Sequence, residues 1–371
     1  MEITFSTPCL MGIEGILAGE LRYLGAQQVE PQNGRVLFRG GEEMLARVNL
    51  CSRYAERVQI LLGSFQALSF EELFQGVRAL PWERWIDKKD AFPVKGRSLS
   101  SALYSVPDCQ SIIKKAVVER LKQKYKLEWF EETGALHQIQ FLFLKDTVNL
   151  LLDTSGAGLH KRGYRANSTE APIKETLAAA RVDIARVRPF SQVYDPFCGS
   201  GTFLIESALK ARNIAPGLNR RFSAERWEQI PASFWREERQ RAGDNIRKDT
   251  EFEGFGFDVD PAAVNLTLEN AKLAGVADCI RAECREISDF SVSSEKALIL
   301  TNPPYGERLL DLDAAREIYR RMGKVFPARP GVSAYIISPD EEFETYFGRR
   351  ADKKRKLYNG MIKCDVYQYF K

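Results

Sequence analysis

Residues 301–306 read Thr301-Asn302-Pro303-Pro304-Tyr305-Gly306 and directly follow a short apolar run, Ala297-Leu298-Ile299-Leu300. The apolar run predicts a buried strand. The two prolines end that strand, because neither has an N–H for a sheet ladder and each fixes its own φ angle. Pro303 also favours an extended conformation for Asn302. The stretch therefore predicts a stiff turn, the elbow, at the carboxyl end of a strand, which is where ligands bind in open parallel α/β sheets.

The chemistry of this elbow suits a planar ring that carries an amino group. The side-chain oxygen of Asn302 and the carbonyl oxygen of Pro303 are both acceptors, and a rigid turn can direct them at one point. Tyr305 adds an aromatic ring, on which a nucleic-acid base would stack with a contribution of about 1–3 kcal/mol. A plain loop with a double-proline stop is the alternative, so the upstream sequence has to distinguish the two.

Residues 192–203 predict a strand, a glycine turn and the start of a helix. The glycines allow a ligand to approach the backbone, and the helix N-terminus is electropositive. The turn is not a P-loop, because no Gly-Lys-Ser/Thr follows it, and Cys198 stands where a dinucleotide fingerprint would have its third glycine. Asp195 at the strand end would repel phosphate and accept an amino group. The pattern therefore indicates a cationic ligand without phosphate, S-adenosylmethionine (SAM).

Two further predicted strands also end in acids. In the first, at 254–258, we expect Asp258 to accept the ribose hydroxyl groups, whereas Asp260 caps the helix that Pro261 begins. The second, at 277–283, ends at Glu283, where this class of cofactor site often has an acid for the adenine amino group. In this order, the glycine turn, the acid-tipped strands and the elbow resemble a class I methyltransferase that acts on an exocyclic amine.

Composition indicates the cell compartment of the protein and argues against some cofactors. The chain has 371 residues, 44% of them hydrophobic and 28% charged, which is typical of a soluble protein of about two or three domains. No apolar run is long enough to span a membrane, and the N-terminus has no signal-peptide features. Seven scattered cysteines and two histidines argue against a zinc site and fit a reducing cytoplasm. We expect a cytoplasmic monomer without a metal, and the net charge of +4 weakly favours an anionic partner.

The first 155 residues predict two small α+β units. Residues 1–65 follow the order strand, helix, strand, strand, helix, strand. Residues 66–155 predict a helix around 70–77, a short strand at 91–94, a basic helix from Pro107 to about Tyr125, and a closing hairpin. The basic face of that helix is either a solvated surface or a phosphate-binding surface. In the second case four cations lie near one helix start: Lys95, Arg97, Lys114 and Lys115.

Two motifs in this region resemble a THUMP domain, an RNA-binding module of RNA-modifying enzymes. They are Phe92-Pro93-Val94-Lys95-Gly96-Arg97 and the stretch Ser105 to Ala116. The unit before it resembles the ferredoxin-like domain that usually packs on a THUMP domain. A basic linker segment follows at 159–165, and we expect it to contact RNA through Lys161, Arg162 and Arg165, the alternative being a charged linker.

The resemblance extends over essentially the whole chain. Five stretches resemble the bacterial 23S rRNA guanine-N2 methyltransferase family with an N-terminal THUMP domain: Gly158 to Arg165, Ala171 to Ala178, Asp195 to Thr202, Asn302 to Leu309, and Leu357 to Gly360. The implied fold is a ferredoxin-like domain (1–65), a THUMP domain (66–155), a linker (156–170) and a Rossmann-like methyltransferase domain with a doubly wound seven-stranded sheet (171–371). One active site is expected.

The resemblance also implies roles for individual residues. Thr176 lies near the cofactor carboxylate, the glycine turn surrounds the methionine part, and Asp258 binds the ribose. The expected cofactor residues are Thr176, Asp195, Phe197, Gly199, Gly201, Thr202, Phe203, Asp258, Val259, Glu283 and Asn302. Asn302, Pro303 and Tyr305 are expected to hold the target base.

Two segments lie outside these motifs. Residues 213–250 form an insertion in which Trp227 and Trp235 are expected to pack on a core, while Arg220 and Arg221 are candidates for RNA contact. Near the end, strands at about 353–358 and 361–369 are expected to form a hairpin through Asn359-Gly360. The basic run at 349–356 is either a charged edge that prevents aggregation or a surface that faces RNA.

The expected reaction is methyl transfer from SAM to the N2 amine of a guanine in 23S rRNA. Adenine N6 in DNA or RNA remains an alternative, because the elbow suits any planar amine, although the THUMP-like unit argues against DNA. Guanine N2 in tRNA and a glutamine side chain in a protein are further alternative substrates. A non-catalytic RNA-binding or assembly factor is the alternative from a different class.

Overall fold

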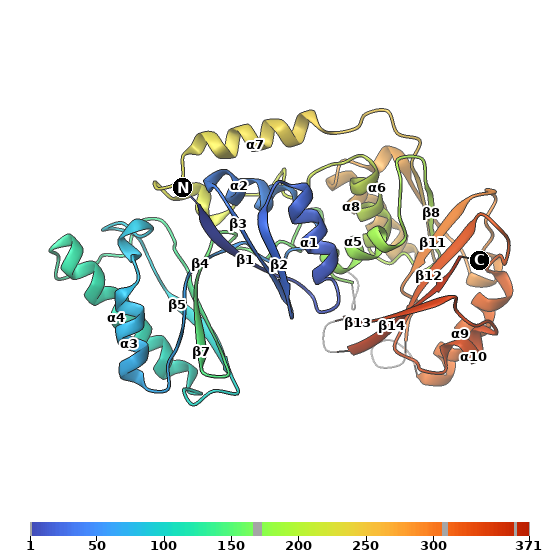
Figure 1. Cartoon of the computed structure of the whole chain (residues 1–371). Coiled ribbons are helices and arrows are strands. Elements are labelled where there is room, and N and C mark those ends of the chain that lie inside the picture. Colours follow the sequence, from blue (N-terminus) through green and yellow to red (C-terminus); the bar gives the residue numbers. More distant parts are fainter. Residues whose placement is uncertain (1, 166–172, 306–310, 360–361, 371) are drawn as a thin grey trace. The chain divides into compact units, whose positions relative to one another are not determined.

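The computed structural model describes residues 2–165, 173–305, 311–359 and 362–370. It divides into two compact units (Figure 1). The first comprises Met1–Cys9, Leu17–Leu159 and Arg220–Arg241, and the second comprises Leu10–Ile16, His160–Asn219 and Ala242–Lys371. Within the described ranges, no helix is both long enough and apolar enough to cross a membrane.

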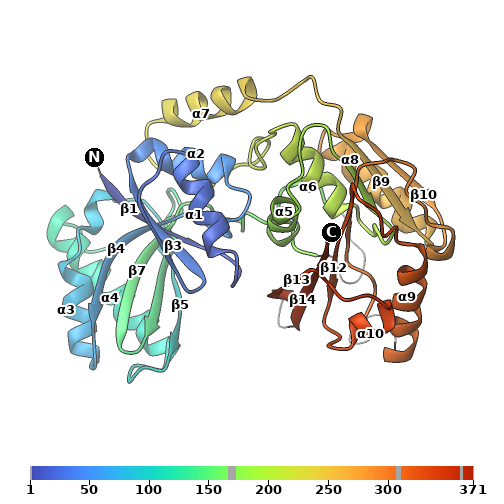
Figure 2. The ribbon, with the colours of Figure 1, turned by 45° about the vertical axis from the view of Figure 1, so that its right-hand side comes forward.

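The first unit is built on one seven-stranded sheet of order β2-β3-β1-β4-β7-β6-β5. Its first half confirms the predicted order of six elements: β1 (Ile3–Pro8), α1 (Glu14–Tyr23), β2 (Gln27–Gln32), β3 (Arg35–Gly40), α2 (Glu42–Cys51) and β4 (Gln59–Gln66). Its second half contains α3 (Phe70–Ala79), β5 (Val94–Leu99), α4 (Val106–Tyr125), β6 (Ile139–Leu144) and β7 (Thr147–Asp153). Helices α3 and α4 lie side by side along one face of this half (Figure 2).

The strand predicted at 91–94 is wrong in position. Strand β5 begins at Val94, runs to Leu99 and pairs in parallel with β6, whereas Ala91 makes only an isolated bridge to Leu136. Gly96 explains the difference, because a Cβ atom there would lie 2.4 Å from the ring of Phe141. This glycine allows close packing inside a strand rather than ending one.

Residues Arg220–Arg241 of the insertion belong to the first unit, and Trp227 and Trp235 are buried as predicted. Trp227 stacks on His137 with ring centroids 4.2 Å apart, and its Nε1 donates to the carbonyl oxygen of Leu136. Trp235 stacks on Phe222. The insertion contains η2 (Ser223–Arg226) and α7 (Ala232–Asp244). The core that these rings join is therefore that of the first unit, not that of the sheet into which they are inserted.

The second unit is a doubly wound sheet of order β10-β9-β8-β11-β12-β14-β13. All of its pairings are parallel except those of β14, which runs antiparallel to β12 and β13 and forms the predicted hairpin. Its strands are β8 (Gln192–Asp195), β9 (Glu253–Asp258), β10 (Ile280–Cys284), β11 (Ala297–Thr301), β12 (Val332–Ser338), β13 (Lys353–Asn359) and β14 (Ile362–Tyr369). Its helices are α5 (Glu175–Ile184), α6 (Thr202–Ala211), α8 (Pro261–Leu273), α9 (Leu312–Val325) and α10 (Phe343–Phe347), with short 3-10 turns η3 (Ala277–Cys279) and η4 (Ile287–Asp289).

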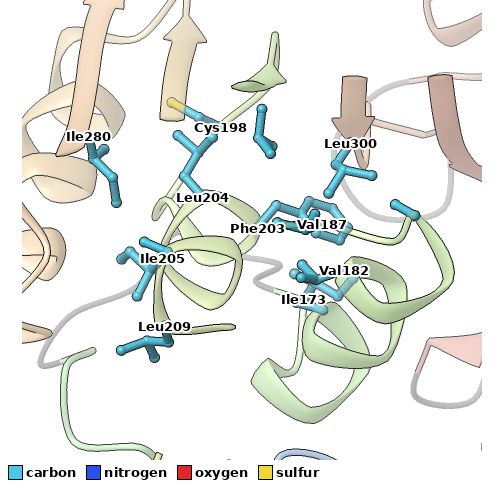
Figure 3. Close-up of a cluster of buried hydrophobic side chains, with 14 of the residues drawn as sticks. Ile173, Val182, Val187, Cys198, Phe203, Leu204, Ile205, Leu209, Ile280 and Leu300 are labelled. Atoms are coloured by element: carbon cyan, nitrogen blue, oxygen red, sulfur yellow. The ribbon is translucent and has the colours of Figure 1, made fainter. Parts of the chain in front are cut away.

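Two apolar layers cover this sheet. Helices α5, α6 and α8 bury one face, where Val182, Leu204 and Leu300 of β11 belong to one cluster of buried side chains (Figure 3). Helices α9 and α10 bury the other face. The strand order reverses at β8, so the chain leaves β8 toward one face of the sheet and leaves β11 toward the other. This leaves a crevice at the carboxyl ends of the two strands, which is where ligands bind in this class of sheet.

Candidate active site

The glycine turn joins β8 to α6 at the carboxyl edge of the sheet. Gly199 and Gly201 have φ angles of +51° and +77°, which favour glycine. Two buried side chains of α8 hold this turn: Thr267 donates to the carbonyl oxygen of Gly199 (2.9 Å), and Asn270 donates to that of Ser200 (3.0 Å). The turn is therefore held in place by side chains of a neighbouring helix. Sequence reasoning missed both α8 residues, because nothing in their local pattern links them to the turn.

Asp195 ends β8 and is only 2% exposed. Its Oδ1 accepts from the backbone N–H of Phe197 (3.2 Å) and from the hydroxyl of Thr301 (2.8 Å). Burial raises the pKa of Asp195 to about 7, against the lowering effect of these hydrogen bonds. Thr301 directly precedes Asn302, so one hydrogen bond joins the predicted cofactor turn to the elbow. Sequence reasoning missed this role of Thr301.

Asp258 ends β9, and its carboxylate also contacts the turn. One oxygen accepts from the N–H of Gly199 (3.0 Å) and the other from the N–H of Asp260 (3.1 Å). Asp260 caps α8 by accepting from the N–H of Ala262, as predicted. On the neighbouring strand, Glu283 forms an ion pair with Arg285. The turn and its two acids therefore form one hydrogen-bonded group.

The elbow presents a buried acceptor, the side-chain oxygen of Asn302. The Oδ1 atom of Asn302 is buried, and no hydrogen-bond partner for it exists within the described residues. A buried unpaired acceptor costs free energy, so such an atom often marks a ligand contact. Pro303 is buried as well. Tyr305 is 5% exposed, so the predicted stacking on a base requires that ring to become accessible. Gly306 lies outside the described residues.

The residues at this edge fit SAM better than a phosphate-bearing cofactor. Asp195 and Asp258 place two carboxylates beside the glycine turn, and carboxylates attract an amino group and hydroxyl groups but repel phosphate. Thr176, Thr202 and Phe203 are buried. Phe197 is partly buried against the α9 side of the sheet, and Val259 is exposed. Hydrogen bonds thus unite Asp195, the turn and Asp258. Glu283 is instead paired with Arg285, and the side chain of Val259 is exposed.

The prediction that four RNA-binding cations lie near one helix start is wrong. Lys95 and Arg97 are exposed on the same face of β5. Lys114 and Lys115 lie well inside α4, which begins at Val106, and are not near its start. Lys114 is also held by an ion pair with Glu132.

Burial also argues against RNA contact for two further arginines. Arg162 is 6% exposed and paired with Glu206, and Arg220 is 9% exposed and donates to the carbonyl oxygens of Ala157 and Leu159. We infer structural roles for both, because a guanidinium group held in this way cannot reach a phosphate without breaking these bonds. Arg165 is paired with the buried Glu175. Lys161 and Arg221 are exposed.

Three family profiles match the chain. They are described as an RMKL-like methyltransferase domain (residues 162–368), an RlmL ferredoxin-like domain (4–59) and a THUMP domain (67–153). Together with the strand order and the glycine turn, they define a class I SAM-dependent methyltransferase with N-terminal ferredoxin-like and THUMP domains. The chain belongs to the RMKL-like methyltransferase family.

Similar proteins extend this finding. The protein named "Putative RNA methyltransferase YpsC" of Bacillus subtilis is 45% identical over 362 residues, which cover 97% of this chain and 94% of that protein. The ribosomal RNA large subunit methyltransferase K/L of Aeromonas salmonicida is 33% identical over 391 residues. That match covers 98% of this chain and 54% of the relative, so the chain spans about half the length of this relative.

Solved structures agree on the fold and the cofactor. The crystal structure of a predicted N6-adenine-specific DNA methylase from Listeria monocytogenes is 44% identical, with a TM-score of 0.95 and coverage of 100% of this chain and 96% of that chain. SMU.472, solved in complex with SAH, is 40% identical, with a TM-score of 0.95 and coverage of 100% and 98%. The cofactor of this chain is SAM.

Proposed function

We propose that this chain, as a cytoplasmic monomer, transfers the methyl group of SAM to the exocyclic N2 of a guanine in 23S ribosomal RNA. The observation that carries the proposal is the buried Oδ1 of Asn302, just after β11, for which the described residues supply no hydrogen-bond donor. The names of the K/L relatives and the THUMP domain favour ribosomal RNA as the substrate. The resemblance of the motifs to guanine-N2 methyltransferases favours N2 as the target atom.

An exocyclic amine is a poor nucleophile, because its lone pair is delocalised into the ring. In the proposed mechanism, Asn302 Oδ1 and the Pro303 carbonyl oxygen accept its two N–H groups and orient the developing lone pair. SAM, when bound, would supply an electrophilic methyl group on a positively charged sulfur. As the nitrogen forms its bond to that carbon, the sulfur–carbon bond would break to leave SAH, and one of the two amine protons would pass to water. Asp195 and the glycine turn hold the amino-acid part of the cofactor, and Asp258 holds the ribose. Positioning of this kind provides most of the rate enhancement.

A covalent cysteine intermediate is not part of this mechanism. Burial raises the pKa of Cys198 well above its usual range, so its thiol stays protonated at neutral pH. Its Sγ also lies near Thr267 Oγ1, which fits a packing role in the turn.

Adenine N6 is the second candidate target. The same two acceptors suit any planar amine, and the name of the Listeria structure includes this activity. The THUMP domain favours RNA over DNA as the nucleic acid, and guanine N2 in tRNA remains within the same mechanism.

Nucleoside analysis tests the proposal. The protein is incubated with labelled SAM and with separate pools of 23S rRNA, tRNA and DNA from a strain that lacks it, and the methylated nucleoside is then identified. We expect N2-methylguanosine in 23S rRNA only. The same nucleoside in tRNA would contradict the substrate, N6-methyladenine would contradict the target atom, and no label in any pool would contradict catalysis on free nucleic acid.

A further inference from the structure

We propose that the β13–β14 hairpin binds single-stranded RNA beside the target nucleotide. This inference rests on the proposed function and adds to it the form of RNA that the site accepts. The proposal rests on Tyr358 and Lys363, which lie on the part of the hairpin that extends past β12.

The register of the sheet places the hairpin beside the elbow. Strand β12 ends at Ser338, which pairs with Asp365, so Ile362–Cys364 of β14 extend beyond β12 on the carboxyl side. At roughly 3.3 Å per residue this extension is about 10 Å long. Strands β12 and β14 follow β11 in the sheet at a spacing of about 4.8 Å. One strand of RNA can therefore reach both the elbow at the end of β11 and this hairpin.

The extending part carries a side-chain pair suited to a nucleotide. Tyr358 pairs with Lys363 across the ladder, so both side chains lie on the same face of the hairpin. Tyr358 is 42% exposed and Lys363 is exposed. A base stacks on an exposed aromatic ring, and a neighbouring ammonium group attracts the phosphate.

The rest of β13 adds positive charge. Lys353, Lys354, Arg355 and Lys356 are consecutive and exposed. Lys354 pairs with Glu344, and Lys356 lies opposite Asp365 in the ladder. In the described part of the chain, Lys353, Arg355 and Lys363 form no ion pair. Side chains of a strand alternate between its two faces, so Lys353 and Arg355 lie on the face opposite to Tyr358. Lys363 is therefore the cation of these three that lies beside the ring and is available to an anionic strand.

A buried charge on α5 lies near Arg355 of β13. Arg181 is 2% exposed, and its guanidinium nitrogens have no hydrogen-bond partner within the described residues. Burial, together with the nearby charge of Arg355, lowers the pKa of Arg181 to about 9, so the group still carries its charge at neutral pH. Protection of an edge strand from aggregation explains lysines on β13, but it does not explain an exposed tyrosine, which favours aggregation.

The test compares RNA affinities of full-length variants by fluorescence anisotropy. The probe is a labelled single-stranded RNA oligonucleotide, alone or annealed to its complement. We expect Y358A/K363A to lose roughly five- to one-hundred-fold in affinity for the single strand. The slope of log affinity against log salt should fall by about 0.7. Affinity for the duplex should change little, and Y358F should bind the single strand like the wild type.

The matched control is F190A/K296A, which removes an exposed ring and an exposed lysine just before β8 and β11, at the opposite edge of the sheet. SAM affinity, measured by calorimetry, should be unchanged in every variant. Unchanged single-strand affinity in Y358A/K363A, or an equal loss for single strand and duplex, would overturn the hairpin assignment even if the wild type methylates 23S rRNA. Absence of methylation by a wild type that binds RNA through the hairpin would instead contradict the proposed function.

Discussion

The hydroxyl group of Thr301, at the end of β11, donates a hydrogen bond to the carboxylate of Asp195 (2.8 Å). We expect Thr301→Val to slow methyl transfer roughly ten- to one-hundred-fold, because the elbow would lose its link to the cofactor turn and small displacements of reacting groups are costly. Thr301→Ser keeps the hydroxyl and should stay near the wild-type rate. Single-turnover rates at saturating SAM and RNA measure both variants. A serine variant as slow as the valine variant would contradict this role.

The raised pKa of Asp195 makes stability depend on pH. Its pKa of about 7 in the folded protein exceeds the ordinary value of 3.8, so the folded protein binds this proton more tightly than the unfolded chain does. The resulting stabilisation is complete below the unfolded pKa and is lost as the pH rises through about 7. Asparagine is neutral at every pH. At pH 8, the free energy of unfolding of Asp195→Asn should therefore exceed that of the wild type by up to a few kcal/mol, whereas at pH 3.5 this gain should be absent.

Denaturant titrations at the two pH values measure this difference. Asp249→Asn, which changes an exposed acid, serves as the control and should show no such trend. A gain for Asp195→Asn that is the same at both pH values would contradict the raised pKa.

At the scale of the element, the glycine turn depends on a left-handed conformation and on contact with α8. Gly201→Ala should destabilise the fold by about 1–3 kcal/mol and weaken SAM binding, because φ is +77° and the new Cβ would lie 2.9 Å from Thr267. Gly275→Ala is the matched control: its φ is +72°, but no atom crowds its Cβ position. It should lose stability and keep SAM affinity. Calorimetry that shows equal SAM affinity for both variants would contradict the importance of this contact.

Most elements were predictable because their residues carry local signals. The apolar run before the elbow, the acid-tipped strands and the Asn-Gly hairpin follow from periodicity and turn chemistry. The start of β5 was missed because Gly96 serves strand packing, not a turn. The insertion was assigned to a core, but the pattern of its tryptophans does not indicate which unit supplies that core. Contacts between distant residues, such as Asn270 with the turn, leave no local trace.

At the scale of the whole molecule, cofactor binding should stabilise the fold. SAM at one hundred times its dissociation constant adds about 2.7 kcal/mol to the free energy of unfolding. We expect Asp258→Ala to lose most of the corresponding rise in melting temperature at the same SAM concentration. Asp260→Ala removes the cap of α8, so it should lower stability by about 1 kcal/mol and keep the SAM-dependent rise. A full SAM-dependent rise in Asp258→Ala would contradict the ribose contact.

The site as a whole was only partly predictable. The residue types of the turn and elbow indicated SAM and a planar amine, because those side chains have few other common uses in that order. The sequence did not show which cations can reach RNA, because residues with the same charge look alike in a sequence. The structure distinguishes them by burial: Lys95 and Arg97 are exposed, whereas Arg162 and Arg220 are buried.

The central claim is that Asn302 acts on the target amine and not on the cofactor. The most direct measurement pairs the SAM dissociation constant with the single-turnover methylation rate of Asn302→Ala on 23S rRNA. Asn265→Ala, an exposed asparagine of α8, is the control. We predict a rate loss of roughly one-hundred- to one-thousand-fold with unchanged SAM affinity. Equal losses of rate and affinity, or a wild-type rate, would contradict the claim.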